Sequence, residues 1–115
     1  MEYELIQELQ AKTRQLEASI KLLRQNGTAY AQAERDYKIL LRQECLKLRD
    51  EGVAIGMINM TAYGIPSVAE ARFKRDVAET IYFANKEAIN SVKLQMRLIE
   101  GQIQREYGMA GRGDM

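Results

Sequence analysis

The chain has 115 residues, of which 46% are hydrophobic and 29% are charged. This length leaves room for one domain, and the composition is too apolar for a disordered chain. No run of 18 apolar residues is present, and the acidic start MEYELIQELQ lacks the features of a secretory signal, so we expect a cytoplasmic protein without a membrane partner. Seventeen basic and 16 acidic residues leave a net charge of +1, which argues against a protein that coats DNA.

Two residue types that build many active sites are scarce. Histidine is absent, and Cys45 is the only cysteine. Within one chain this excludes a disulfide framework, a Cys/His zinc site and a His-based catalytic triad. With no histidine to activate its thiol, Cys45 is expected to act as a small core hydrophobe. We therefore expect no catalytic residues, no cofactor and no metal, and predict that the protein is not an enzyme.

The first 51 residues carry helical spacing with one interruption. A helix is predicted over 2–25, because apolar or neutral residues recur at intervals of four and three. These residues are Leu9, Thr13, Leu16, Ile20 and Leu23. Asn26-Gly27 predicts a left-handed helix end, and Thr28 can cap a second helix over 29–51. Because so short a connection makes its helices antiparallel neighbours, we expect an N-terminal helical hairpin.

A third, longer helix is predicted over 67–107. Pro66 precedes a capping-box pattern at Ser67 and Glu70. One heptad frame then continues for the whole segment, and we call its residues the C-terminal seam: Ala71, Arg75, Ala78, Tyr82, Asn85, Ile89, Val92, Met96, Ile99 and Ile103. A flank of Phe73, Val77, Ile81, Ala84 and Ala88 widens the apolar face. The expected fold is all-α: a hairpin packed on a long C-terminal helix in one coiled-coil-like bundle domain (1–107), followed by a flexible tail (108–115).

The predicted helix lengths do not match. At 1.5 Å per residue the third helix would be about 60 Å long and each hairpin helix about 35 Å. An overhang of about 25 Å would leave the end of the C-terminal seam uncovered. We therefore expect a homo-oligomer joined through Asn85, Ile89, Val92, Met96, Ile99 and Ile103. The alternative is a helix kinked near Gly101 or at Asn90-Ser91, which folds back on itself.

Residues 53–65, which we call the connector, are apolar without clear periodicity. They read VAIGMINMTAYGI and contain two interior glycines. We predict that Ile55 and Ile58 are buried and that Met57, Met60 and Tyr63 are partly exposed. Methionine side chains adapt well to varied partners, so these three residues form the candidate partner-binding surface.

The densest cluster of charges lies at the start of the third helix. Arg72 and Arg75 share a helix face where the helix dipole also favours anions, and with Phe73 and Tyr63 they make a candidate anion or nucleotide site. The interpretation we favour is that Arg75 pairs with an acid across the bundle, such as Glu34 or Glu44.

Two further polar features have structural explanations. Asp76 and Glu79 lie three residues apart, but no second acidic pair faces them, so a paired or solvated face is favoured over a metal site. Asn85 interrupts the apolar C-terminal seam, and such residues commonly determine helix register or oligomer state.

The segment Val68–Glu79 (VAEARFKRDVAE), followed by Glu87-Ala88-Ile89-Asn90 and Arg105-Glu106-Tyr107, resembles a family of short helical proteins from phages and prophages of Gram-positive bacteria. The N-terminal Leu23-Arg24-Gln25-Asn26-Gly27 is similar to it as well, so the resemblance covers most of the chain. The family's stretch after the second helix differs from Val53–Ile58 here. The resemblance implies viral origin and location in the bacterial host cell. It carries no assigned activity and no catalytic residues.

These features favour a non-enzymatic phage binding protein that engages and inhibits a host factor, with a component of host defence as one such target. Two alternatives stay open. One is an oligomer that binds a nucleotide signal between subunits, and the other is a structural or replication accessory protein. No feature of the sequence indicates nucleic acid as a partner.

Overall fold

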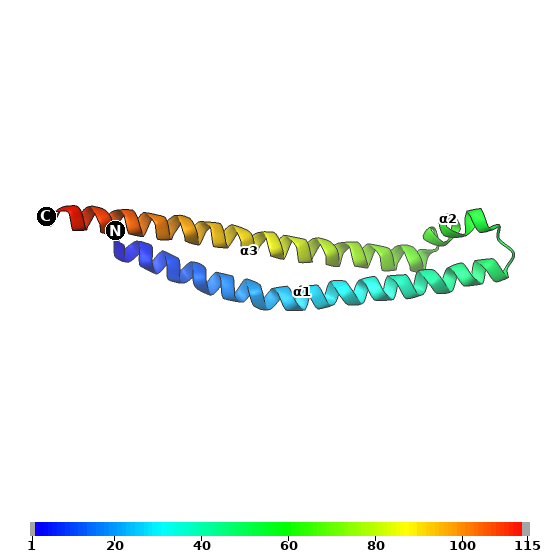
Figure 1. Ribbon diagram of the computed structural model, residues 1–115. Helices are drawn as coiled ribbons and strands as arrows, with labels where there is room; N and C mark the ends of the chain where they lie inside the picture. Colours follow the sequence, from blue (N-terminus) through cyan, green and yellow to red (C-terminus); the bar gives the residue numbers. More distant parts are fainter. Residues whose placement is uncertain (1, 114–115) are drawn as a thin grey trace. The chain divides into compact units, whose positions relative to one another are not determined.

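The computed structural model describes the backbone of residues 2–113 and the side chains of residues 3–108. Its elements are α1 (Glu2–Asp50), the 3₁₀ turn η1 (Ile55–Met57), α2 (Ile58–Tyr63) and α3 (Pro66–Gly113), shown in chain order in Figure 1. Helices take up nearly all of residues 2–113, and these residues form no strand, which confirms the all-α class. Within the described range, no helix contains a stretch long and apolar enough to cross a membrane.

The chain divides into two compact units, and each contains a segment of α1 and a segment of α3. Unit 1 comprises Met1–Arg24 and Ala84–Met115. Its helix segments run antiparallel and bury Ile89, Val92 and Ile99, whose side chains are 8% exposed or less. The Asn85 amide interrupts this apolar contact and donates a hydrogen bond of 3.1 Å to the backbone oxygen of Ser19. Asn85 therefore joins the two helices of the unit, as a polar residue that determines register would.

Unit 2 comprises Gln25–Phe83 and includes the connector. Its segments of α1 and α3 also run antiparallel, since Tyr30 contacts Glu79 and Glu34 contacts Arg75. Among its described residues the buried hydrophobic side chains are Tyr37, Ala62 and Val68. This is a small core for a segment of 59 residues.

The predicted break at Asn26-Gly27 is wrong, because α1 continues through both residues without interruption. A glycine inside a helix costs about 1 kcal/mol relative to alanine. Packing explains its presence here, since a Cβ atom on Gly27 would lie 3.2 Å from Cε1 of Tyr82. The missing side chain lets the Tyr82 ring of α3 lie close to α1. The N-terminal helical hairpin is therefore replaced by one helix, and the hairpin of this protein is formed by α1 and α3.

Continuity of α1 also changes its contact face. The predicted contact face of α1 included Thr13 and Ile20. Ile20 is 49% exposed, whereas its neighbour Ser19 is half-buried, so the prediction is wrong at Ile20. A broken helix could use a separate frame in each half, but an unbroken one keeps a single frame. Counting back in sevens from Ala33 in unit 2 leads to Asn26, Ser19 and Lys12, and all three are half-buried.

The two long helices match in length, with 49 residues in α1 and 48 in α3. The difference in helix length from which an oligomer through the C-terminal seam was argued is therefore absent. Ile89, Val92 and Ile99 are buried inside unit 1, Met96 and Ile103 are half-buried there, and Asn85 is hydrogen-bonded to Ser19. The expected oligomer seam is thus an intramolecular one. The alternative of a kink at Gly101 or Asn90-Ser91 is also wrong, because α3 is unbroken.

The helix ends differ from prediction in detail. α1 ends at Asp50, and Gly52 follows with a φ of 86°, which is the left-handed conformation expected of a glycine after a helix. α3 begins at Pro66 rather than at Ser67, consistent with the preference of proline for the first helical position. Its backbone remains helical to Gly113, beyond the end predicted at Tyr107. The rest of the expected flexible tail, 114–115, lies outside the described residues.

Candidate functional site

The connector presents apolar side chains to solvent. The exposed fractions are 88% for Ile55, 50% for Met57, 69% for Met60 and 43% for Tyr63. The predicted exposure of the last three residues is confirmed, and the predicted burial of Ile55 is wrong. Ile55 opens the single turn η1, none of whose three residues is buried. A single turn has too few residues to bury one face against the helices, so Ile55 remains in solvent.

The same segment is anchored on its other side. Ala62 in the connector has no exposed surface, and neither has Val68, which follows near the start of α3. Ile58, which was predicted to be buried, is half-buried. The Cys45 thiol on α1, itself half-buried, lies 3.6 Å from Oδ1 of Asn59 and can donate a weak hydrogen bond to it. The connector is therefore anchored through Ala62 and Asn59, while Ile55, Met57, Met60 and Tyr63 are exposed.

Arg75 is bound within the helix pair. Its guanidinium lies 4.7 Å from the ring centroid of Tyr37 and its Nε donates a 2.7 Å hydrogen bond to Asp76. Its Nη1 is 3.9 Å from a carboxylate oxygen of Glu34, which confirms the pairing across the bundle. The hydrogen bond to Asp76 raises the pKa of Arg75, against the opposing effect of partial burial. Stacking on Tyr37 and two carboxylates thus satisfy this cation.

The residues of the candidate nucleotide site do not converge. The guanidinium carbon of Arg72 lies 5.3 Å from the ring centroid of Tyr63 on α2, whereas the guanidinium of Arg75 lies over Tyr37 on α1. Phe73 is 63% exposed and lines a separate shallow hollow on α3. Three side chains that diverge in this way cannot enclose one phosphate, so the structural interpretation of the cluster is the better one.

The carboxylates considered for a metal have partners within the protein. Glu79 accepts a 2.8 Å hydrogen bond from the Tyr30 hydroxyl, and Asp76 is held by Arg75. The hydrogen bond to Glu79 is the main reason that the pKa of Tyr30 is raised above its ordinary value, with desolvation and the charge of Glu34 adding to it. Within residues 3–108 no group of three or more acidic or cysteine side chains could hold a metal ion.

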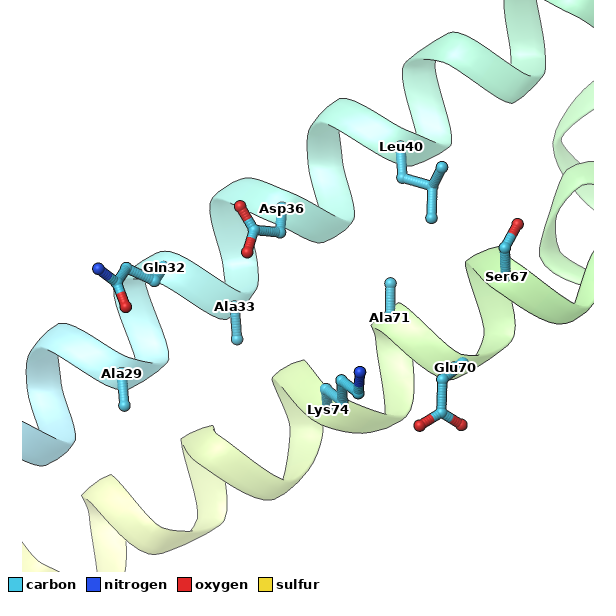
Figure 2. A pocket seen from close by; sticks show the side chains of 9 residues that line it. All are labelled: Ala29, Gln32, Ala33, Asp36, Leu40, Ser67, Glu70, Ala71 and Lys74. Atoms are coloured by element: carbon cyan, nitrogen blue, oxygen red, sulfur yellow. The ribbon is translucent and has the colours of Figure 1, made fainter.

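A pocket of about 530 Å³ lies between α1 and α3 in unit 2, and we call it the interhelix pocket. Its α1 side is formed by Ala29, Gln32, Ala33, Asp36 and Leu40, and its α3 side by Ser67, Glu70, Ala71 and Lys74. Figure 2 shows Ala29, Ala33 and Leu40 pointing toward α3 and Ala71 pointing toward α1. The hollow exists because small side chains stand at positions where larger ones would fill the gap between the helices.

The sequence prediction missed this pocket, although a signal for it was present. Ala33 and Ala71 occupy contact positions of the two heptad frames, and Ala29 flanks them. Small residues at contact positions leave space unfilled between two packed helices. The prediction already paired Arg75 with Glu34 across the bundle, but it did not consider what the alanines beside that pair leave unfilled.

Comparison of the chain with protein-family models, with curated proteins and with solved structures gives no match. The candidate sites therefore rest on the geometry of the chain itself.

Proposed function

We propose that the protein is a non-enzymatic binding protein that engages another protein through the connector. The observation that supports this function is the opposite exposure of neighbouring connector residues. Ala62 is fully buried, while Ile55 and Met60 are 88% and 69% exposed. An anchored segment that displays large apolar side chains has the anatomy of a binding surface, because its backbone loses little freedom when the partner arrives.

The resemblance to phage helical proteins makes a bacterial host factor the proposed partner, with inhibition of that factor as the outcome. Methionine suits this use, since its flexible, polarisable side chain packs against surfaces of varied shape. Beside the exposed methionines, the guanidinium of Arg72 stacks on the ring of Tyr63. Binding without catalysis is the activity that we propose.

We also propose that the chain works as a homo-oligomer. Unit 2 buries few hydrophobic side chains, and several on its helices remain exposed, among them Ile39, Phe73 and Ile81. Apolar surface of this kind favours association.

The test of the binding function is affinity capture from a bacterial host lysate with the full chain as bait. The connector variant Ile55→Ser/Met57→Ser/Met60→Ser should lose a protein that the unmodified chain retains. The control is Ile20→Ser/Leu94→Ser, which removes two apolar side chains of unit 1 that are 49% and 53% exposed. The control should retain the same protein. Equal capture by all three chains would contradict the proposal.

A further inference from the structure

One flank of unit 2 is closed and the other is open. The closed flank holds Tyr30 bonded to Glu79, Arg75 bonded to Glu34, and the Tyr82 ring against Gly27. The open flank holds the interhelix pocket. Large side chains and ion pairs fill the first flank, whereas small residues leave the second one hollow.

On α3 the open flank continues beyond the pocket as an apolar row. Glu70 and Lys74 line the pocket, and Val77 and Ile81 follow at spacings of three and four, which places all four on one side of the helix. Val77 is 42% exposed and Ile81 is 50% exposed. Two branched apolar side chains therefore project beside the hollow.

On α1 the same pattern occurs. Gln32 and Asp36 line the pocket, and Ile39 follows at the spacing that keeps it on their side of the helix. Ile39 is 50% exposed. Both helices of unit 2 thus carry apolar side chains toward the side on which the pocket opens.

Charges on this face complement one another. Glu70 supplies a carboxylate, Asp36 supplies a second one that also pairs with Arg35 at 3.3 Å, and Lys74 supplies one ammonium group. Glu70 and Lys74 make no ion pair with any part of the chain that the structure describes. Two copies of one face related by a two-fold axis bring each residue opposite residues of the other copy, so Lys74 of each can meet a carboxylate of its partner.

We propose that the open flank of unit 2 is the self-association surface and that a second copy of this chain docks there to form a four-helix bundle. The inference rests on the self-association in the proposed function and names its surface. Val77 and Ile81 of one copy are the projecting side chains, and the hollow floored by Ala33 and Ala71 of the other receives them, as knobs enter holes in coiled coils. The pairing is isologous, so both copies bury the same residues.

The available area is sufficient for a stable dimer. Unit 2 contains about 39 Å of α1 and about 27 Å of α3, and with helices about 10 Å across each copy offers about 650 Å². Two copies would bury about 1,300 Å², which falls within the range of about 1,200–2,000 Å² found for specific interfaces.

Sedimentation equilibrium of the full chain at several concentrations tests the proposal. The unmodified protein should approach twice the chain mass of 13.2 kDa. Lys74→Glu makes the charges of the face uniformly negative, and Asp36→Lys/Glu70→Lys makes them uniformly positive. Each variant should dissociate to monomer, with a dimer dissociation constant raised at least about tenfold by like-charge repulsion. An equimolar mixture of the two variants should recover the dimer, because a negatively charged face then meets a positively charged one.

Arg42→Glu is the control. It changes the net charge by the same amount as Lys74→Glu, but Arg42 does not line the pocket. It should keep the dimer, and all variants should keep the helical circular dichroism signal because the altered side chains are exposed. A monomer at every concentration of the unmodified protein would overturn the proposal. A dimer that survives in both charge variants would overturn the assigned surface. The connector variant leaves this face intact, so its result bears on partner binding alone.

Discussion

The hydroxyl of Tyr30 donates a hydrogen bond of 2.8 Å to the carboxylate of Glu79, which lies 49 residues further along the chain. This bond joins α1 to α3 on the closed flank of unit 2. Next to it the ring centroid of Tyr30 lies 5.9 Å from that of Tyr82 and 6.4 Å from that of Phe83. An aromatic cluster and a charge-assisted hydrogen bond thus hold together two segments that share no local sequence signal.

The Tyr30–Glu79 bond predicts a loss of stability in alkali. Because the folded state raises the pKa of Tyr30, its contribution is fully present below pH 10 and is lost as pH rises through the higher value of the folded state. The melting temperature of the unmodified protein should therefore fall more between pH 9 and pH 11 than that of Tyr30→Phe. Thermal melts followed by circular dichroism at both pH values measure this difference. Parallel curves for the two chains would show that the bond does not couple to folding.

Replacement of Arg75 should destabilise the protein. Arg75→Met keeps much of the side-chain volume but removes the stacking on Tyr37 and both carboxylate contacts, which should cost about 1–3 kcal/mol. Urea unfolding measures the change. Arg35→Met is the control, because the ion pair of Arg35 within the described residues is with its neighbour Asp36 and its side chain is 65% exposed. Its loss should change the free energy of unfolding by less than about 0.5 kcal/mol.

We expect the effect of Gly27→Ala on stability to depend on whether the Tyr82 ring is present. Gly27→Ala alone should gain less than the full helix-propensity benefit of about 1 kcal/mol, because the added Cβ would meet the Tyr82 ring at 3.2 Å. In a Tyr82→Ala background that contact is gone, and the full benefit should appear. A double-mutant cycle by urea unfolding measures the coupling. Equal gains in both backgrounds would mean that Tyr82 does not account for the glycine.

We expect opposite effects on stability from substitutions of exposed connector residues and of the buried Val68 near the start of α3. Met57→Ser/Met60→Ser should change stability by less than about 1 kcal/mol, since both side chains are at least half exposed. Val68→Ala should cost about 1–3 kcal/mol, because it opens a cavity at a fully buried position. Melting temperatures of the two variants provide the comparison. A large loss for the methionine variant would identify the connector as core and remove it as a binding surface.

Periodicity alone determined much of α3. Its heptad frame from Ala71 to Ile103 was predictable because side chains three and four apart share a helix face, and the structure places Ile89, Val92 and Ile99 of that frame in the core. The pairing of Arg75 with Glu34 was favoured in advance for a similarly local reason, since an arginine at a contact position requires an acid nearby. Exposure of the connector methionines also followed from composition, because the segment has more apolar surface than a short connection can bury.

Only the tertiary structure decided where α1 ends and what its faces contact. Asn-Gly is a strong local stop signal, but the helix continues through it, and the absence of a side chain at Gly27 admits the ring of Tyr82, 55 positions further along the chain. The continuous helix has Ser19 rather than Ile20 in its half-buried row. It also sets Ala33 on α1 against Ala71 on α3 across the interhelix pocket. At Asn26-Gly27 the local preference for a helix end competes with packing against a residue far along the chain. The sequence pattern shows the local preference but not the packing.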